Sequence, residues 1–124
     1  MSFLAACIQL QCNSDAERNW RACEDLIRQA AQKGARLIAT PENTTFLGPH
    51  AQKVALAEGI DGPTNRRFAE LAKDLNITLL VGSVAERSTS ETNRCHNTSL
   101  LFETDGSLIS SYRKIHLFDV DVED

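Results

Sequence analysis

GARLIATPEN, residues 34–43, decides how this chain folds, because a short apolar run stands there between a glycine and a proline. Gly34 suits the position just after a helix, where a left-handed backbone is common. Residues Ala35–Pro41 are predicted to form a short strand of mainly apolar character, as expected of strands covered on both faces. The proline restricts its own backbone and favours extended geometry in the residue before it, so the strand should end stiffly.

A helix is predicted directly before this strand. Ser14 and Glu17 have the spacing of a capping box, which marks a helix N-terminus. Apolar residues then recur at steps of three and four and indicate one apolar helix face: Ala16, Trp20, Cys23, Ile27, Ala30 and Ala31. Residues Phe3–Gln11 precede the helix and are strand-like. Together the three segments predict a β-α-β unit with parallel strands and a right-handed crossover.

The rest of the chain continues the alternation. Pro63 is expected in the first turn of a second helix, whose apolar face is Phe68, Leu71, Ala72 and Leu75 and which ends at Asn76. A helical turn is expected over 51–58, strands over 77–85, 96–103 and 107–113, and an exposed loop over 86–94. The dipeptide Asp105-Gly106 is typical of a hairpin turn. The order β-α-β-α-β-β-β predicts an α/β fold with helices on one face of a sheet.

Composition restricts the function classes. The chain has 124 residues and a formal net charge of −4, from 13 basic and 17 acidic residues, so no basic patch indicates nucleic acid or anionic lipid. No apolar run approaches the roughly 20 residues of a membrane span. The N-terminal segment lacks the charged start of a secretory signal, which predicts a cytosolic protein. Four cysteines without C-x-x-C spacing predict free thiols and no metal site.

Two residues could carry chemistry. Glu42 follows the carboxyl end of a predicted parallel strand, where ligand sites gather in open α/β sheets, so it could act as a general base. Lys114 lies in the run YRKIHLFD, residues 112–119, where Tyr112, Lys114 and His116 would share one strand face. An enclosed ammonium there would stabilise developing negative charge. Taken singly, each residue also fits an ordinary surface charge, and His116 fits either a general base or a structural histidine.

The ordered set of motifs is more specific than its parts. ACIQL at residues 6–10, LIATPEN at 37–43, LLVGS at 79–83, NTSLLF at 97–102, DG at 105–106 and YRKIHLFD at 112–119 occur in this order. The set resembles the nitrilase, or carbon–nitrogen hydrolase, superfamily over essentially the whole chain. It is most similar to the branch of ω-amidases and deaminated-glutathione-amidase-like enzymes. The resemblance implies a four-layer α-β-β-α sandwich, of which residues 1–124 would be the N-terminal portion of a single domain.

That resemblance also implies a mechanism. The family hydrolyses small amides or nitriles through a Glu-Lys-Cys triad, without a metal or organic cofactor. Glu42 matches its general base, and Lys114 matches the lysine that holds the oxyanion. The family cysteine is expected roughly thirty residues beyond the lysine, after another strand, so it would fall outside this sequence. A further family glutamate is expected just past the last residue. No cysteine of this chain matches the nucleophile by motif.

The sequence therefore leaves two interpretations open. In the first, residues 1–124 belong to an amidase that acts on a small ω-amide, is expected to be a homo-oligomer at full length, and is predicted to be inactive as this chain alone. In the second, the chain is a non-catalytic interaction module that pairs with a full-length homologue, either through exposed sheet edges or through the dimer surface that the resemblance implies. Retention of both Glu42 and Lys114 favours the first. The substrate itself is not encoded in any loop visible here.

Overall fold

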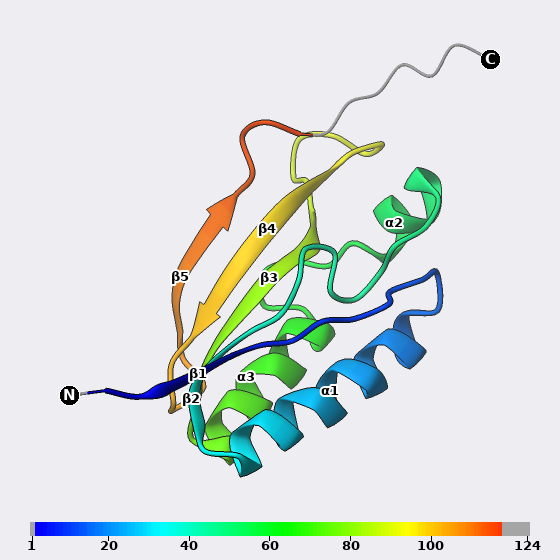
Figure 1. The fold of residues 1–124 in the computed structure, drawn as a ribbon. Helices are drawn as coiled ribbons and strands as arrows, with labels where there is room; N and C mark the ends of the chain where they lie inside the picture. Colours follow the sequence, from blue (N-terminus) through cyan, green and yellow to red (C-terminus); the bar gives the residue numbers. More distant parts are fainter. Residues whose placement is uncertain (1, 118–124) are drawn as a thin grey trace.

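The computed structural model describes residues 2–117 (Figure 1). The predicted strands and helices follow in the predicted order, except that the helical turn expected over 51–58 is a helix of 7 residues, so two helices stand between the second and third strands. The elements are β1 (Leu4–Cys7), α1 (Ala16–Gln32), β2 (Ala35–Ala39), α2 (His50–Leu56), α3 (Pro63–Leu75), β3 (Thr78–Arg87), β4 (Cys95–Phe102) and β5 (Leu108–Arg113). The last two residues of the YRKIHLFD motif lie outside the described residues.

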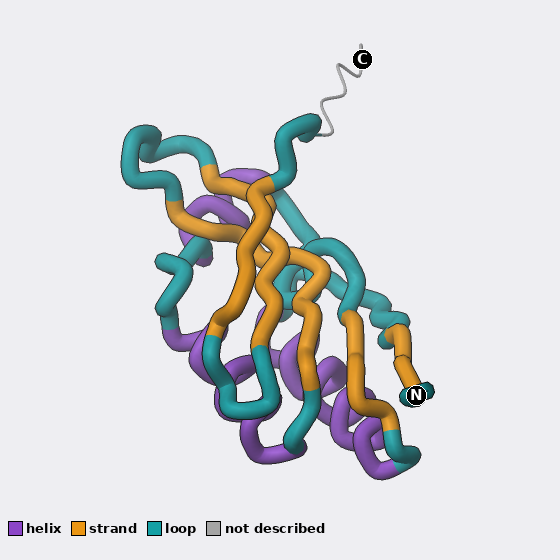
Figure 2. Tube along the Cα trace, turned by 90° about the vertical axis from the view of Figure 1, so that its left-hand side faces the viewer, coloured by secondary structure: helices purple, strands orange, loops and turns teal. Residues whose placement is uncertain are grey.

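All five strands belong to one sheet with the order β1-β2-β3-β4-β5. The pairs β1–β2 and β2–β3 are parallel, whereas β3–β4 and β4–β5 are antiparallel. This arrangement confirms the α/β class and the parallel strands of the predicted β-α-β unit. In Figure 2 the strands lie in front and the helices behind them, so one face of the sheet is covered and the other is open.

The covered face holds the core. Trp20 of α1 packs edge-to-face on Phe68 of α3, with ring centroids 4.8 Å apart, and the Arg67 guanidinium lies 4.1 Å from the centre of the tryptophan ring. Residues from both helices and from β2, β3 and β4 complete the cluster, among them Cys23, Ile27, Ile38, Leu71, Leu79, Val81 and Leu100. Successive strand residues point to opposite faces, so every second side chain of β4 from Thr98 to Phe102 is buried on this side.

The turns follow the predicted residue types. Gly34 closes α1 with φ 92°, and Gly106 occupies the β4–β5 hairpin with φ 86°. Asn76 ends α3 in the left-handed conformation, with its N–H bonded to the carbonyl oxygens of the last helical turn. These backbone conformations are ones that glycine and asparagine adopt at lower cost than other residues.

The start of α1 differs from the prediction. The N-cap is Asp15 and not Ser14: a side-chain oxygen of Asp15 accepts a hydrogen bond from the Arg18 N–H at 3.0 Å. The helix begins one residue later than expected, so Glu17 is in the first turn, where its carboxylate pairs with Arg67 at 3.0 Å. A capping box would need that carboxylate to turn back to the chain, and the ion pair holds it elsewhere.

Two further boundaries were predicted wrongly. β1 covers only Leu4–Cys7 of the expected 3–11, because it is an edge strand whose side chains are mostly exposed, although the Ile8 N–H still donates to the Ala39 carbonyl at 2.8 Å. β3 continues through Arg87, so Glu86 does not begin an exposed loop. Its carboxylate is buried, at 5% exposure, because an arginine of β5 compensates the charge.

Candidate functional site

The turn after β2 carries Glu42 and is bonded to β3 along its length. The Thr40 N–H donates to the Leu80 carbonyl at 2.9 Å, and the Thr44 N–H donates to the Ser83 carbonyl at 2.9 Å. Between them, the Asn43 N–H donates to the Ser83 hydroxyl at 2.8 Å. These bonds hold the backbone on both sides of Glu42, so its side chain leaves the sheet from a fixed point, as the proline at position 41 led us to expect.

Glu42 meets two side chains from strands that are distant in sequence. The Lys114 ammonium donates to Oε1 of Glu42 at 2.8 Å, and the Asn97 amide donates to the same oxygen at 2.7 Å. The Lys114 N–H also donates to the Asn97 carbonyl at 2.8 Å, which continues the β4–β5 pairing one residue beyond β5. We call Glu42, Asn97 and Lys114 the polar trio. It lies on the open face of the sheet, because Asn97 alternates with the core-facing Thr98.

The Asn97 amide has only one reasonable orientation. Its Nδ2 faces the Glu42 carboxylate, whereas its Oδ1 is buried and has no hydrogen-bond partner among the described residues. Exchanging the two atoms would place the amide oxygen against a carboxylate oxygen, and both are acceptors. The carboxylate therefore fixes the asparagine as a donor, at the cost of one unpaired carbonyl oxygen.

Electrostatics keeps Glu42 ionised. The hydrogen bond from Lys114 is the largest cause that lowers the pKa of Glu42, and the bond from Asn97 is the next. Partial burial opposes them, and the charges of Lys114 and Lys53 act in the lowering direction. The Glu42 side chain is 52% exposed, so solvent screens the pair and its contribution to stability is small. At neutral pH the carboxylate is thus a proton acceptor beside an ammonium.

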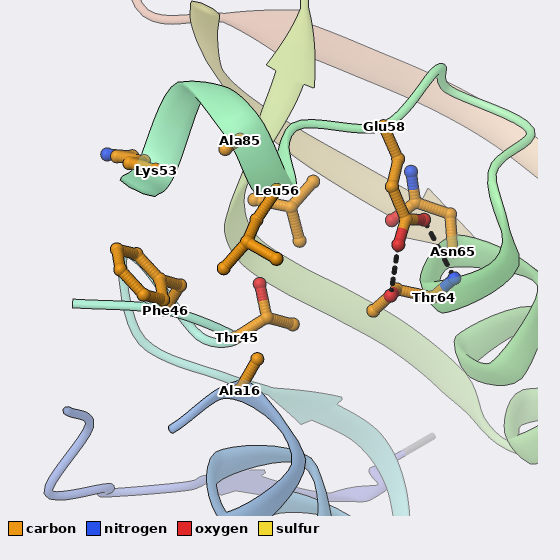
Figure 3. A pocket seen from close by; sticks show the side chains of 10 residues that line it. Ala16, Thr45, Phe46, Lys53, Leu56, Glu58, Thr64, Asn65 and Ala85 are labelled. Carbon is orange, nitrogen blue, oxygen red and sulfur yellow. Dashed lines mark hydrogen bonds between the residues drawn. The ribbon is translucent and has the colours of Figure 1, made fainter. Parts of the chain in front are cut away.

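A cavity of about 70 Å³ lies beside this turn, and its lining does not include the polar trio. Its walls come from the start of α1, the loop after β2, α2, the α2–α3 connection with the start of α3, and β3 (Figure 3). Glu58 accepts hydrogen bonds there from the Thr64 N–H and hydroxyl at 2.8 and 2.6 Å, which caps α3. Lys53 lines the cavity, and its ammonium donates to the Asn43 side chain at 2.6 Å. Phe46 also lines it and is buried, at 4% exposure.

The four cysteines differ in environment. Cys23 is fully buried in the core, and burial raises its pKa to about 12. Cys12 donates to the Thr44 carbonyl at 3.3 Å, and burial raises its pKa as well. Burial also raises the pKa of Cys95, against the charge of Lys53. Cys7 lies exposed in β1. The raised pKa values of Cys12, Cys23 and Cys95 are the opposite of the lowered pKa by which a nucleophilic cysteine is recognised.

The structure brings together the two residues singled out from the sequence, Glu42 and Lys114. Within the described residues, His116 makes no hydrogen bond or ion pair with either of them; it is exposed and follows the end of β5. Sequence reasoning missed the donor role of Asn97. Its position in the sequence could have indicated that role. Asn97 lies near the start of the predicted strand 96–103, which was expected to pair with strand 107–113, and that strand ends next to Lys114.

The geometry defines a class of site: a carboxylate and an ammonium in contact, beyond the carboxyl end of a parallel strand in an α/β sheet. Residues 4–124 match the model of the carbon-nitrogen hydrolase family. The chain is 41% identical to human omega-amidase NIT2 over 124 residues and 33% identical to deaminated glutathione amidase from Synechocystis over 122. Each match covers 98% of this chain, but 43% and 45% of the relative.

Solved structures of related proteins show the same fold over this part of the chain. The C. elegans NitFhit protein superposes with a TM-score of 0.86 at 29% identity, covering 95% of this chain and 29% of that one. An amidase from Nesterenkonia sp. gives 0.79 at 25% identity, covering 94% and 44%. The chain therefore belongs to the carbon-nitrogen hydrolase family and carries part of the nitrilase-superfamily fold. It spans less than half the length of these relatives. Within residues 2–117, no helix has the length and apolar character to cross a membrane.

Proposed function

We propose that residues 1–124 form the N-terminal portion of a single carbon–nitrogen hydrolase domain and supply two members of an amidase site. Glu42 is the general base, and Lys114 stabilises the oxyanion. The observation that supports this proposal is the 2.8 Å contact between the two side chains, made across 72 positions of sequence. Amide hydrolysis by a thiol needs a base and a group that stabilises the oxyanion, and an ionised carboxylate beside an ammonium can supply both.

The proposed reaction uses these groups in turn. Glu42 takes the proton of a thiol, and the thiolate attacks the amide carbon. The carbonyl oxygen becomes an oxyanion beside the Lys114 ammonium, which has three N–H donors and uses one on Glu42. The proton on Glu42 passes to the nitrogen, and ammonia leaves. Glu42 then takes a proton from water, and the hydroxide attacks the thioester carbon. The C–S bond breaks, the acid leaves, and Glu42 returns its proton to the thiolate, which regenerates the thiol.

The thiol is proposed to come from outside residues 1–124. The thiol of Cys23 is enclosed in the core, and none of the other three cysteines has a recorded contact with the polar trio within the described residues. The names of the relatives suggest the substrate class. Because the chain resembles omega-amidases throughout, we propose a small ω-amide. We accordingly propose that the chain of residues 1–124 does not hydrolyse such an amide by itself.

A chimera tests the proposal without reference to where this chain ends. Residues 1–124 replace the matching segment of human omega-amidase NIT2, and ammonia release from a small ω-amide is measured. Activity is expected in the chimera and absent from residues 1–124 alone. Glu42→Gln and Lys114→Gln should each lower kcat/KM by roughly a hundredfold or more. Lys73→Gln, on the last turn of α3, is the matched control and should leave it unchanged.

Two results would overturn the proposal. One is a folded chimera, with circular dichroism like that of the parent, in which Glu42→Gln keeps full activity. The other is hydrolysis by residues 1–124 alone that a single change such as Cys95→Ala abolishes, since the nucleophile would then lie within this chain.

The interaction-module interpretation stays a second proposal. It is supported by the uncovered sheet face, which exposes apolar side chains such as Leu80 and Tyr112, at 37% and 57%. Native mass spectrometry of the chain mixed with a full-length homologue tests whether the two form a heteromer. If no heteromer forms, the module interpretation is wrong, whereas the amidase proposal is unaffected.

A further inference from the structure

Directly behind the polar trio, on the helix-covered side of the sheet, lies a second charged cluster. Glu86 of β3 is 5% exposed and accepts three hydrogen bonds. The Arg113 guanidinium donates to both carboxylate oxygens, at 2.6 and 2.9 Å, and the Thr98 hydroxyl donates at 2.7 Å. A two-pronged arginine–carboxylate contact of this kind fixes orientation as well as distance. We call Glu86, Thr98 and Arg113 the rear cluster.

Glu86 keeps its charge although it is buried, whereas the Arg113 side chain that pairs with it is 58% exposed. The hydrogen bond from Arg113 is the largest cause that lowers the pKa of Glu86; burial opposes it, and Thr98, the Arg113 charge and His96 act in the lowering direction. Removing a carboxylate from water is costly, and a well-packed apolar group at the same place is often at least as stabilising. Because Arg113 stays partly in water, solvent screens the pair and its contribution to stability is small; what the two-pronged contact supplies is a fixed orientation.

The two clusters use adjacent residues of the same two strands. Thr98 follows Asn97 in β4, and Lys114 follows Arg113 at the end of β5. Successive strand residues point to opposite faces, so the rear cluster and the polar trio lie back to back. Thr98 is paired with Arg113 across the two strands, and the Lys114 N–H bonds to the Asn97 carbonyl.

Little else holds the end of β5. It is an edge strand, every residue of it is exposed, and its backbone pairs with β4 alone among the described strands. The side chain of Arg113 is the part of this strand end that reaches across β4 to β3, where it finds the buried carboxylate. The strand end therefore has one side-chain anchor, and Lys114 is the next residue along the chain.

We propose that Glu86 is a positioning residue: through Arg113 and Thr98 it fixes the end of β5 and the start of β4, and so holds Lys114 and Asn97 on Glu42. This inference rests on the proposed roles of Glu42 and Lys114 and names the residue that keeps them in contact. Glu86 takes no part in the reaction itself, because it lies on the opposite face of the sheet.

Glu86→Gln in the full chain tests the inference, with the pKa of Glu42 measured by carboxyl carbon NMR during a pH titration. Removing a nearby negative charge would by itself lower the pKa of Glu42. Loosening Lys114 and Asn97 removes the two hydrogen bonds that depress it, and so raises it. The two effects have opposite signs. We expect a rise of roughly half a pKa unit, the scale of an exposed ion pair.

Arg113→Lys is the second variant, and it decides the matter if Glu86→Gln does not fold. It keeps the charge but loses the fork that grips both oxygens of Glu86, so a shift in the pKa of Glu42 can come only from geometry. Glu17→Gln is the matched control, because it breaks an ion pair of α1 far from the sheet edge and should leave Glu42 unchanged. An unchanged or lowered pKa of Glu42 in Glu86→Gln, or an unchanged one in Arg113→Lys, would overturn the inference.

The titration does not depend on catalysis, so it can fail or succeed separately from the proposed function. In the NIT2 chimera, the same variants should lower kcat by about tenfold or more while KM changes little, because displacement of a catalytic group acts on the reaction step. Loss of stability with the pKa of Glu42 and kcat both intact would mean that Glu86 is only structural.

Discussion

Gly82 of β3 gives the sharpest test of how the turn that carries Glu42 is held. A Cβ atom built on Gly82 would lie 2.6 Å from both the carbonyl carbon and the carbonyl oxygen of Pro41, and closer still to the Thr40 carbonyl oxygen. All of these are backbone atoms, so no side chain can rotate away. We therefore predict that Gly82→Ala forces the turn after β2 away from β3.

The magnitude follows from what the displacement breaks. The Gly82 N–H donates to the Thr40 hydroxyl at 3.1 Å, and the Ser83 N–H donates to the Pro41 carbonyl at 3.3 Å. Overpacking costs about 1–3 kcal/mol, and each weakened hydrogen bond adds up to about 1 kcal/mol. We expect Gly82→Ala to lower the free energy of unfolding by about 2–4 kcal/mol. The pKa of Glu42 should also rise, because its contacts with Lys114 and Asn97 lengthen.

Urea unfolding followed through the single tryptophan, Trp20, measures the stability, and carboxyl NMR measures the pKa of Glu42. Gly59→Ala is the matched control, because its Cβ would meet only a side-chain oxygen of Asp61 at 3.1 Å, which can move. If Gly82→Ala loses no more stability than Gly59→Ala and leaves the pKa of Glu42 in place, the close approach does not position the turn.

Three other predictions address the cap, the ion pair and the core thiol. Asp15→Ala should lower the free energy of unfolding by about 1 kcal/mol and Ser14→Ala by much less, because Asp15 caps α1; equal losses would contradict this. Lys114→Gln should raise the pKa of Glu42, because it removes the hydrogen bond that lowers this pKa most. In the unchanged protein, the lowered pKa stabilises the fold above the unfolded-state pKa of Glu42, and this stabilisation is lost as the pH falls through the lower folded-state pKa. The variant should therefore lose less stability on acidification to pH 3, and an unchanged pKa of Glu42 would count against the contact. Cys23 should resist alkylation at pH 8 until the chain unfolds, since its pKa is about 12; modification of folded protein would show that the core opens.

Much of the fold could be predicted because local signals agreed with one another. The apolar face of α1, the glycine after it and the apolar strand that follows all indicate the same β-α-β unit, and the Asp-Gly hairpin places β4 beside β5. The cap at Asp15 was missed because two capping residues stand side by side, and only the partner of Glu17 decides between them.

The site was only partly predictable. Glu42 and Lys114 were singled out mainly through resemblance, and nothing local to either residue shows that they meet. Asn97 and Glu86 escaped because their roles depend on sheet register. The register of the β3–β4 pairing shifts between Val81 and Val84. This shift decides to which face of the sheet each later side chain of β3 points, and therefore which residues of β4 and β5 it contacts. A polar residue such as Glu86 looks like a loop residue until its partner from another strand is known.

The uncovered side of the sheet has a consequence for chemistry. The polar trio and the exposed apolar residues of β3 and β5 occupy that same side, so bulk water reaches both together. A surface that covers the apolar residues would also exclude water from the ammonium and the carboxylate, and the attraction between two opposite charges is stronger away from water. If Glu42 and Lys114 have the proposed roles, covering the apolar residues and strengthening the attraction between these two charges would be a single event.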